Sequence, residues 1–131
     1  MERLRAEGHA FEFRTTRQLT QTELYRAIEG CDVYVDELRC GSYGVTAVEA
    51  MAAGKATVTF IRPDLIDQYP PELPIVNANP DTIYDALKKL ITEPDFRLER
   101  SLAGRSYVEK YHDSLVVARE MLEIYKQIGL K

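Results

Sequence analysis

The chain has 131 residues, 45% of them apolar and 29% charged, and a formal net charge of −4 at pH 7. A chain of this length is expected to form one domain over residues 1–131, with enough apolar residues for a core. The acidic balance argues against general affinity for nucleic acids or anionic membranes. No apolar run approaches the roughly 18 residues of a membrane span, and the chain starts without a hydrophobic signal core. We therefore expect a cytoplasmic protein without an integral membrane segment.

The cysteines and histidines are too dispersed for a metal site. Cys31 and Cys40 lack the C-x-x-C spacing of redox and zinc centres, so we expect them to be small buried thiols. His9 and His112 lie near opposite ends of the chain. We expect no metal ion and no other cofactor.

The first predicted elements are a strand and a helix. Residues 9–14 read HAFEFR, in which apolar and polar side chains alternate as they do in a half-buried strand. Thr20 and Glu23 have the S/T-x-x-E spacing of a capping box, in which each side chain bonds the backbone amide of the other residue. A helix is therefore predicted over residues 21–30.

Two further strands enclose a short helix. Residues 31–38 (CDVYVDEL) and 57–61 (TVTFI) favour extended backbone, and residues 45–53 between them favour a helix. Strands that alternate with helices form parallel sheets, so the predicted fold class is α/β, a Rossmann-like parallel sheet flanked by helices. Ligands bind beyond the carboxyl ends of the strands in such sheets. The loop after residue 38 lies at such a position.

The second half of the chain is predicted to be mostly helical. Residues 63–74 are rich in proline and indicate a surface excursion, which is followed by a short strand at 75–77. Asn79 is expected to cap a helix that starts at Pro80 and ends at residue 92. Two more helices are predicted, over residues 95–112 and, after a cap at Asp113 or Ser114, over residues 115–130.

A glycine-containing loop leads directly into the short helix. The loop consists of Gly41, Ser42, Tyr43 and Gly44. Glycines let backbone amides approach a ligand, and the first turn of a helix offers unpaired N–H donors with about half a positive charge. A phosphate can bind there. The loop matches neither G-x-G-x-x-G nor the P-loop sequence, so a plain strand-to-helix turn is an equally good interpretation.

Glu49 is the one acid in a helix that otherwise contains Val, Thr, Ala and Met. An ionised carboxylate among apolar groups is unfavourable unless hydrogen-bond donors surround it. Helical side chains lean toward the N-terminus, so this carboxylate is expected to point toward the glycine-containing loop. A diol such as ribose would satisfy both carboxylate oxygens. Backbone amides or an arginine such as Arg39 are equally good partners.

Residues 31–61 resemble the donor-sugar motif of group 1, retaining glycosyltransferases of the GT-B fold. Members commonly read E-G-F-G before a helix and E-A-M-A-x-G-x-P-V along and after it, and this chain reads GSYGVTAVEAMAAGKATV from residue 41. The run from Asp36 to Gly44 is close to a branch that reads D-Q-x-x-x-G-x-Y-G. The tail is similar to the family's closing helices, with R-x-x-V-x-x-x-H/F at Arg105, Val108 and His112. The resemblance runs from about residue 9 onward, and implies most of the C-terminal half of a GT-B enzyme.

The resemblance also implies roles for individual residues. Glu49 would hydrogen-bond the ribose hydroxyls of a nucleotide-sugar donor, and the backbone amides of Val45 and Thr46 would bind its diphosphate. The implied reaction is the transfer of a hexose to a glycan or other acceptor, with retention of configuration and without a metal, as in polysaccharide biosynthesis. The residues whose backbone would face the donor sugar are Ser42, Tyr43 and Gly44.

The chain departs from the family pattern in ways that affect catalysis. The first acid of the family's Glu-x7-Glu pattern would fall at Gly41, so a carboxylate that faces the sugar is absent there, as it also is in the D-Q branch. The preceding segment DELR, residues 36–39, is expected to substitute in part. Ala56 stands where relatives have proline. The resemblance leads us to expect that this chain lacks the acceptor domain and the first βα unit, which supplies Arg and Lys for the diphosphate. We therefore expect nucleotide-sugar binding without a complete catalytic site, and the catalytic residues are not assigned.

The last predicted helix distinguishes two hypotheses. In GT-B enzymes it crosses to the other domain, so Val117, Met121, Ile124 and Tyr125 are expected to be exposed here. The partner of this stripe would be the N-terminal acceptor domain or a second copy of the chain. The alternative hypothesis is a stand-alone, non-catalytic binding or regulatory module of flavodoxin-like shape, which a fully covered last helix would favour.

Overall fold

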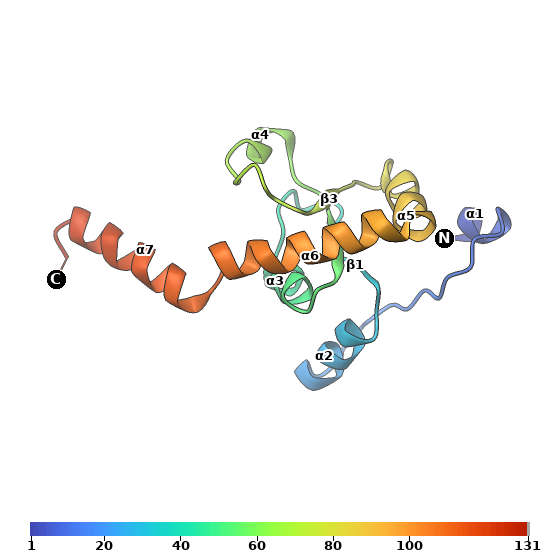
Figure 1. Ribbon diagram of the computed structural model, residues 1–131, viewed down its shortest axis with the longest axis horizontal. Coiled ribbons are helices and arrows are strands. Elements are labelled where there is room, and N and C mark those ends of the chain that lie inside the picture. Colours follow the sequence, from blue (N-terminus) through green and yellow to red (C-terminus); the bar gives the residue numbers. More distant parts are fainter. Residues whose placement is uncertain (131) are drawn as a thin grey trace.

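The computed structural model describes residues 1–130 as an α/β fold around a three-stranded parallel sheet (Figure 1). The strands are β1 (Val33–Val35), β2 (Ala56–Thr59) and β3 (Val76–Asn77). Strand β2 lies in the middle and pairs in parallel with both neighbours, so β1 and β3 are edge strands. All four residues of β2 are buried, as is usual for a parallel sheet flanked by helices. The predicted α/β class with a parallel sheet is confirmed.

The prediction of a strand over residues 9–14 is wrong. The chain begins with a short helix, α1 (Glu2–Ala6), and residues 9–17 form no helix or strand. Phe11 is half-buried, but Phe13 is 48% exposed, and none of the three strands pairs with this segment. An alternating pattern is stable as a strand only beside hydrogen-bonded neighbours, and this segment has none among the described residues.

The capping box at the start of α2 (Gln21–Glu29) is confirmed. Thr20 Oγ1 accepts a hydrogen bond from the Glu23 amide at 3.3 Å, and Glu23 Oε2 accepts one from the Thr20 amide at 2.8 Å. Ile28 is the one fully buried residue of this helix. Helix α2 is therefore anchored near its C-terminal end, while Tyr25 remains 42% exposed.

Helix α3 (Val45–Ala52) lies between β1 and β2 in the chain, as predicted. It buries Ala47, Ala50 and Met51. Gly104 of the long helix α6 (Pro94–Tyr111) lies against it so closely that a Cβ atom on this glycine would be 3.3 Å from Met51 Cγ. The absence of a side chain at this position thus allows α6 to approach α3.

The proline-rich excursion contains a short helix that the sequence did not predict, α4 (Pro63–Ile66). After it, the Asn77 side chain fixes β3 to the end of β2. Its Oδ1 accepts from the Ile61 amide at 2.9 Å, and its Nδ2 donates to the Ile61 carbonyl at 3.2 Å. This pair of bonds continues the sheet beyond the short β3 ladder.

Helix α5 (Ile83–Thr92) starts later than the predicted Pro80. The Asn79 side chain still caps the turn that precedes it, because its Oδ1 accepts from the amides of Asp81 at 2.9 Å and Thr82 at 3.1 Å. The α1 region contacts α5 through Tyr84, whose hydroxyl donates to the carboxylate of Glu7, the residue after α1, and whose ring lies under the Arg3 guanidinium at 3.8 Å.

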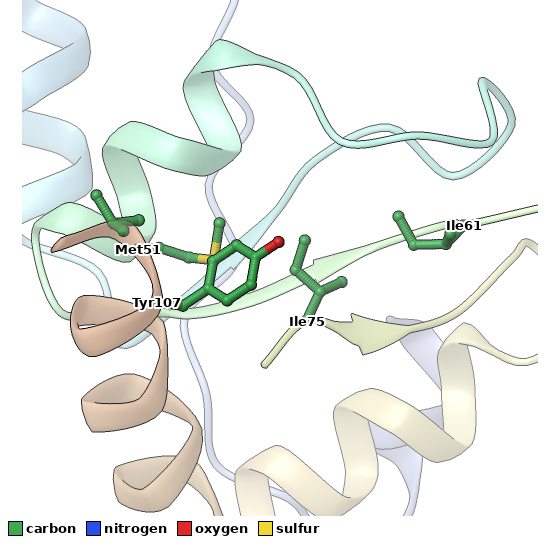
Figure 2. Packing of buried hydrophobic residues seen from close by; sticks show 5 residues of the cluster. Met51, Ile61, Ile75 and Tyr107 are labelled. Carbon is green, nitrogen blue, oxygen red and sulfur yellow. The ribbon is translucent and has the colours of Figure 1, made fainter. Parts of the chain in front are cut away.

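Helix α6 lies across α3, β2 and α5 and covers the core (Figure 1). Its buried Tyr107 packs together with the buried side chains of Met51, Ile61 and Ile75, as Figure 2 shows. A second buried cluster lies around β2. Its members are Ala56, Val58, Ala78 and Leu90.

Helix α7 (Ser114–Gln127) begins after a cap at Asp113, whose carboxylate accepts from the Leu115 amide at 2.9 Å. It projects from the body of the molecule, touching it mainly through the end of α6 (Figure 1). None of its residues is fully buried. The large apolar side chains from this helix onward that are 41–66% exposed are Leu115, Met121, Leu122, Ile124, Tyr125, Ile128 and Leu130.

The expected exposure of the last helix is therefore confirmed for Met121, Ile124 and Tyr125, whereas Val117 is half-buried. Among residues 1–130, no helix is both long and apolar enough to cross a membrane. The prediction for the thiols is wrong in part, because Cys40 is exposed while Cys31 is partly buried.

Candidate functional site

Within residues 1–130, the start of α3 presents three unpaired backbone donors, the amides of Val45, Thr46 and Ala47. Gly44 is the N-cap residue and has no side chain that could bond the first turn. Within the described chain, the amides of Val45 and Thr46 have no hydrogen-bond acceptor. These groups lie at the positive end of the helix dipole. The structure therefore leaves the predicted phosphate-binding amides available.

Gly41 is the tightest position of the loop before α3. Its φ of +89° lies in the left-handed region, and its carbonyl accepts a hydrogen bond from the Arg62 amide at 2.9 Å. A Cβ atom here would be 2.4 Å from Arg62 Cγ. Both the backbone conformation and the contact require glycine, so the acid of the Glu-x7-Glu pattern does not fit at this position.

Asp36 brings a carboxylate to the same helix start. It follows β1, and its Oδ2 accepts from the Gly44 amide at 3.4 Å. The neighbouring Glu37 accepts from the Cys40 thiol instead, at 3.7 Å. A carboxylate near a helix N-terminus stabilises the helix, but it also repels any anion that binds the same amides.

The side chains of Ser42 and Tyr43 bond to other parts of the protein. Ser42 Oγ lies 2.6 Å from the hydroxyl of Tyr69, in the excursion after β2. Tyr43 Oη lies 3.2 Å from Tyr107 Oη and 3.0 Å from Nε2 of His112. The backbone of these two residues therefore remains for a ligand. The resemblance likewise implies that their backbone faces the donor sugar.

Burial favours the neutral forms of Tyr43 and His112. Burial is the main cause that raises the pKa of the Tyr43 phenol far above its usual range, and the hydrogen bond with Tyr107 adds to it. Burial also lowers the pKa of His112, so the imidazole stays neutral. A neutral imidazole has one donor and one acceptor nitrogen, so Nε2 can accept the Tyr43 hydroxyl proton when Nδ1 carries the ring hydrogen.

Glu49 has a partner in the protein that differs from those expected. The Tyr25 hydroxyl donates to Glu49 Oε1 at 3.1 Å, and Tyr25 in turn accepts from the Gln21 side chain at 2.7 Å. Glu49 is half-buried, so its carboxylate still meets solvent. It lies three positions after Thr46, which places both residues on one face of α3.

A hollow of about 240 Å³ lies beside this face of α3. It is open to solvent and bounded by α2, β1, α3 and the segment before α2. Burial and the nearby Asp36 raise the pKa of Tyr34, one of its walls. The lining residues are Thr16, Gln18, Leu19, Leu24, Tyr34 and Thr46.

The tail motif of α6 turns out to be a set of contacts with α3 and its loop. Arg105 Nη1 donates to the Ala52 carbonyl at the C-terminal end of α3, at 2.7 Å. Val108 belongs to the core cluster with Met51, and His112 bonds Tyr43. The pattern R-x-x-V-x-x-x-H/F in the sequence contains Arg105, Val108 and His112 but does not indicate their contacts. No sequence signal points to Tyr25.

Residues 1–130 contain no group of three or more His, Cys, Asp or Glu side chains that could hold a metal ion. No family model matches the chain, and neither does any curated protein or any solved structure. The likeness to group 1 glycosyltransferases therefore rests on the motif residues alone.

Proposed function

We propose that the chain is the nucleotide-sugar-binding part of a glycosyltransferase that transfers a hexose to a glycan or other acceptor. The observation that carries the proposal is the pair of free amides of Val45 and Thr46, with the Glu49 carboxylate one turn further along the same face of α3. A nucleotide sugar has a diphosphate next to a ribose diol, and these two groups need amide donors and a carboxylate acceptor. A cytoplasmic location is part of the same proposal.

In this proposal the amides of Val45 and Thr46 bind the diphosphate and Glu49 binds the ribose hydroxyls. The ribose hydroxyls then take the place of the Tyr25 hydroxyl on Glu49 Oε1 or bind the second carboxylate oxygen. The hollow beside Thr46 would receive part of the nucleoside. The backbone of the loop from Gly41 to Gly44 would face the sugar.

Weak binding is expected from this arrangement. The hollow of about 240 Å³ is smaller than the roughly 300–1,000 Å³ of most small-molecule sites. Arg62, which contacts the loop, has its guanidinium paired with Asp64 at 2.5 Å, and Asp36 opposes an anion. We therefore expect a dissociation constant on the order of 1 mM, about −4 kcal/mol.

Catalysis requires a further surface that carries the acceptor. The exposed apolar stripe of α7, which we define as Met121, Ile124 and Tyr125 together with Ile128 at the C-cap, is a surface that another body can cover. The proposed partner is an N-terminal acceptor domain or, alternatively, a second copy of the chain. An uncovered helix is less consistent with the alternative of a self-sufficient, non-catalytic module.

The test is a titration of UDP- and GDP-sugars at millimolar concentration, followed by ligand-observed NMR and calorimetry. The wild-type chain should bind at least one of them, and Glu49→Ala should bind at least about tenfold more weakly because a charged hydrogen bond to the ribose is lost. Glu120→Ala, an exposed acid on α7, is the matched control and should bind like the wild type. Absence of binding by the wild-type chain would remove the proposal.

A further inference from the structure

We infer that Tyr43 and His112 are a positioning pair that couples the loop Gly41–Gly44 to the junction between α6 and α7. The inference rests on the proposed function, because it identifies what holds the donor-binding loop in place. Tyr43 Oη lies 3.0 Å from Nε2 of His112. His112 is the C-cap residue directly after α6, and α7 begins two positions later, at Ser114.

The loop has few other restraints. Two of its four residues are glycines, which bring conformational freedom and no side-chain contacts. Its backbone is held by the bonds from the Arg62 amide to the Gly41 carbonyl and from the Val48 amide to the Gly44 carbonyl, and by the long bond from the Gly44 amide to Asp36. The remaining restraints are the side chains of Ser42 and Tyr43, so these two residues decide which conformation the loop adopts.

Tyr43 is held from several directions. Its ring lies 5.2 Å from the Tyr69 ring and meets the His112 ring edge-on, with 5.7 Å between the centroids. The Tyr107 hydroxyl completes the hydrogen bonding of the phenol at 3.2 Å. A phenol with two hydrogen-bond partners and two ring contacts is a fixed anchor for the backbone that carries it.

Helix α6 holds α3 at both ends. Arg105 of α6 bonds the last carbonyl of α3 at Ala52, while His112, seven positions later at the C-cap of α6, bonds the loop before α3 through Tyr43. A displacement of the end of α6 would thus act on the loop and spare the Ala52 end. Helix α7 is uncovered and is joined to His112 through Asp113. A partner that covers α7 therefore changes the conformation of the loop Gly41–Gly44. By linkage, occupancy of the loop changes the affinity of α7 for that partner.

Hydrogen exchange of backbone amides tests the coupling without any ligand. The Arg62 and Val48 amides report on the loop, since they bond the carbonyls of Gly41 and Gly44. The Ala53 amide bonds the Glu49 carbonyl and reports on the opposite end of α3. An effect confined to the first two amides indicates loosening of the loop, and an equal effect on all three indicates a general loss of stability.

Two variants remove the pair, and two serve as controls. His112→Phe should speed the exchange of the Arg62 and Val48 amides about tenfold, the effect of one net hydrogen bond, while Ala53 stays unchanged. Tyr43→Phe also loses the bond with Tyr107, so its effect on the same two amides should be at least as large. His112→Gln keeps a side chain that can bond the phenol and should restore slow exchange. Tyr111→Phe removes another hydroxyl of α6, which bonds Glu72, and should leave all three amides unchanged. Unchanged loop amides, or an equal rise at all three, would overturn the inference.

A titration of UDP- and GDP-sugars separates this inference from the proposed function. If the wild type binds, Tyr43→Phe should bind about tenfold more weakly, because the loosened loop must be ordered again. Equal binding by the variant would overturn the positioning role while leaving the proposed function intact. If the wild type binds none of these sugars, the proposed function fails, and the exchange rates alone decide whether the Tyr43–His112 bond holds the loop at the end of α6.

Discussion

Tyr25 and Glu49 come from different helices, and the phenol of Tyr25 donates to Glu49 Oε1 at 3.1 Å. A donor of the protein itself therefore occupies the carboxylate oxygen to which a ribose hydroxyl is proposed to bind. The carboxylate that the sequence singles out is thus partly satisfied before a ligand arrives. Any ligand that uses it competes with Tyr25 or shares the carboxylate with it.

Tyr25→Phe should strengthen nucleotide-sugar binding. The variant removes the competing donor, so the ligand no longer has to replace one hydrogen bond, and affinity should rise by up to about tenfold. Tyr84→Phe is a matched control, because its hydroxyl also bonds a glutamate, Glu7, at a distant place. Calorimetry with the same sugars measures both variants. Weaker binding by Tyr25→Phe would show that the phenol itself contacts the ligand.

Asp36→Asn should also strengthen the binding of anions at the start of α3. The substitution keeps an oxygen that can accept from the Gly44 amide but removes a negative charge beside the free amides. Affinity for a nucleoside diphosphate should rise severalfold at low salt, and the gain should shrink as salt screens the charge. Glu37→Gln is the control, because Glu37 bonds Cys40 rather than the helix start. An unchanged affinity in Asp36→Asn would place the anion elsewhere.

The buried imidazole of His112 should make the free energy of unfolding depend on pH. Burial among the Tyr43 and Tyr107 phenols lowers its pKa in the folded chain relative to the unfolded chain. Protons therefore bind the unfolded state preferentially once the pH falls through about 6.5, and the free energy of unfolding decreases there. The thermal midpoint should be constant above neutrality and should fall between about pH 6.5 and 5.5, before the carboxylates titrate.

His112→Gln supplies the comparison for that measurement. The variant has no imidazole at this position, so the fall of its thermal midpoint over the same pH range should be clearly smaller. Circular dichroism melts at closely spaced pH values measure both proteins. Parallel curves for the two proteins would show that another group causes the dependence.

A larger side chain at Gly104 should destabilise the contact between α3 and α6. Even a Cβ atom would lie 3.3 Å from Met51 Cγ, so Gly104→Leu must push the helices apart. Overpacking of this kind lowers the free energy of unfolding by about 1–3 kcal/mol. Ser106→Leu places the same side chain at an exposed position of α6 and should change stability little. Urea denaturation distinguishes the two, and equal stability would contradict the close approach of the helices.

The exposed stripe of α7 should contribute little to the stability of the chain. Ile124→Ser removes a side chain that is 53% exposed, so the free energy of unfolding should change by about 0.5 kcal/mol or less. Leu90→Ala, at a position with 0% exposure, should lower it by about 2–5 kcal/mol. Denaturant titrations at low protein concentration measure both. A large loss in Ile124→Ser would mean that α7 folds back onto the body.

The sequence predicted those elements whose signals are local. The capping box of Thr20 and Glu23 sets the start of α2, and the cap at Asp113 sets the start of α7. The run from Val45 to Ala52 forms a helix between two strands because its residues favour it and its alanines pack closely. In each case the determining contacts lie within a few residues of one another.

The predictions that failed depend on contacts between distant residues. Residues 9–14 have the pattern of a strand but no neighbour that pairs with them. The partner of Glu49 lies 24 positions away on another helix, and the partner of Tyr43 at the end of α6 lies 69 positions away. Such pairings follow from how the helices are placed on the sheet, which spacing and composition do not encode. The free amides at Val45 and Thr46, by contrast, follow directly from the start of a helix after glycine.

The edge strand β1 has a consequence for how copies of the chain meet. An unpaired strand edge is a template for adding strands from neighbouring molecules, which leads to aggregation. Here the edge is only three residues long, and Asp32 precedes it while Asp36 follows it. A neighbouring copy that aligned its own β1 with this edge would bring acids toward acids. At neutral pH, this repulsion opposes sheet growth from one molecule to the next.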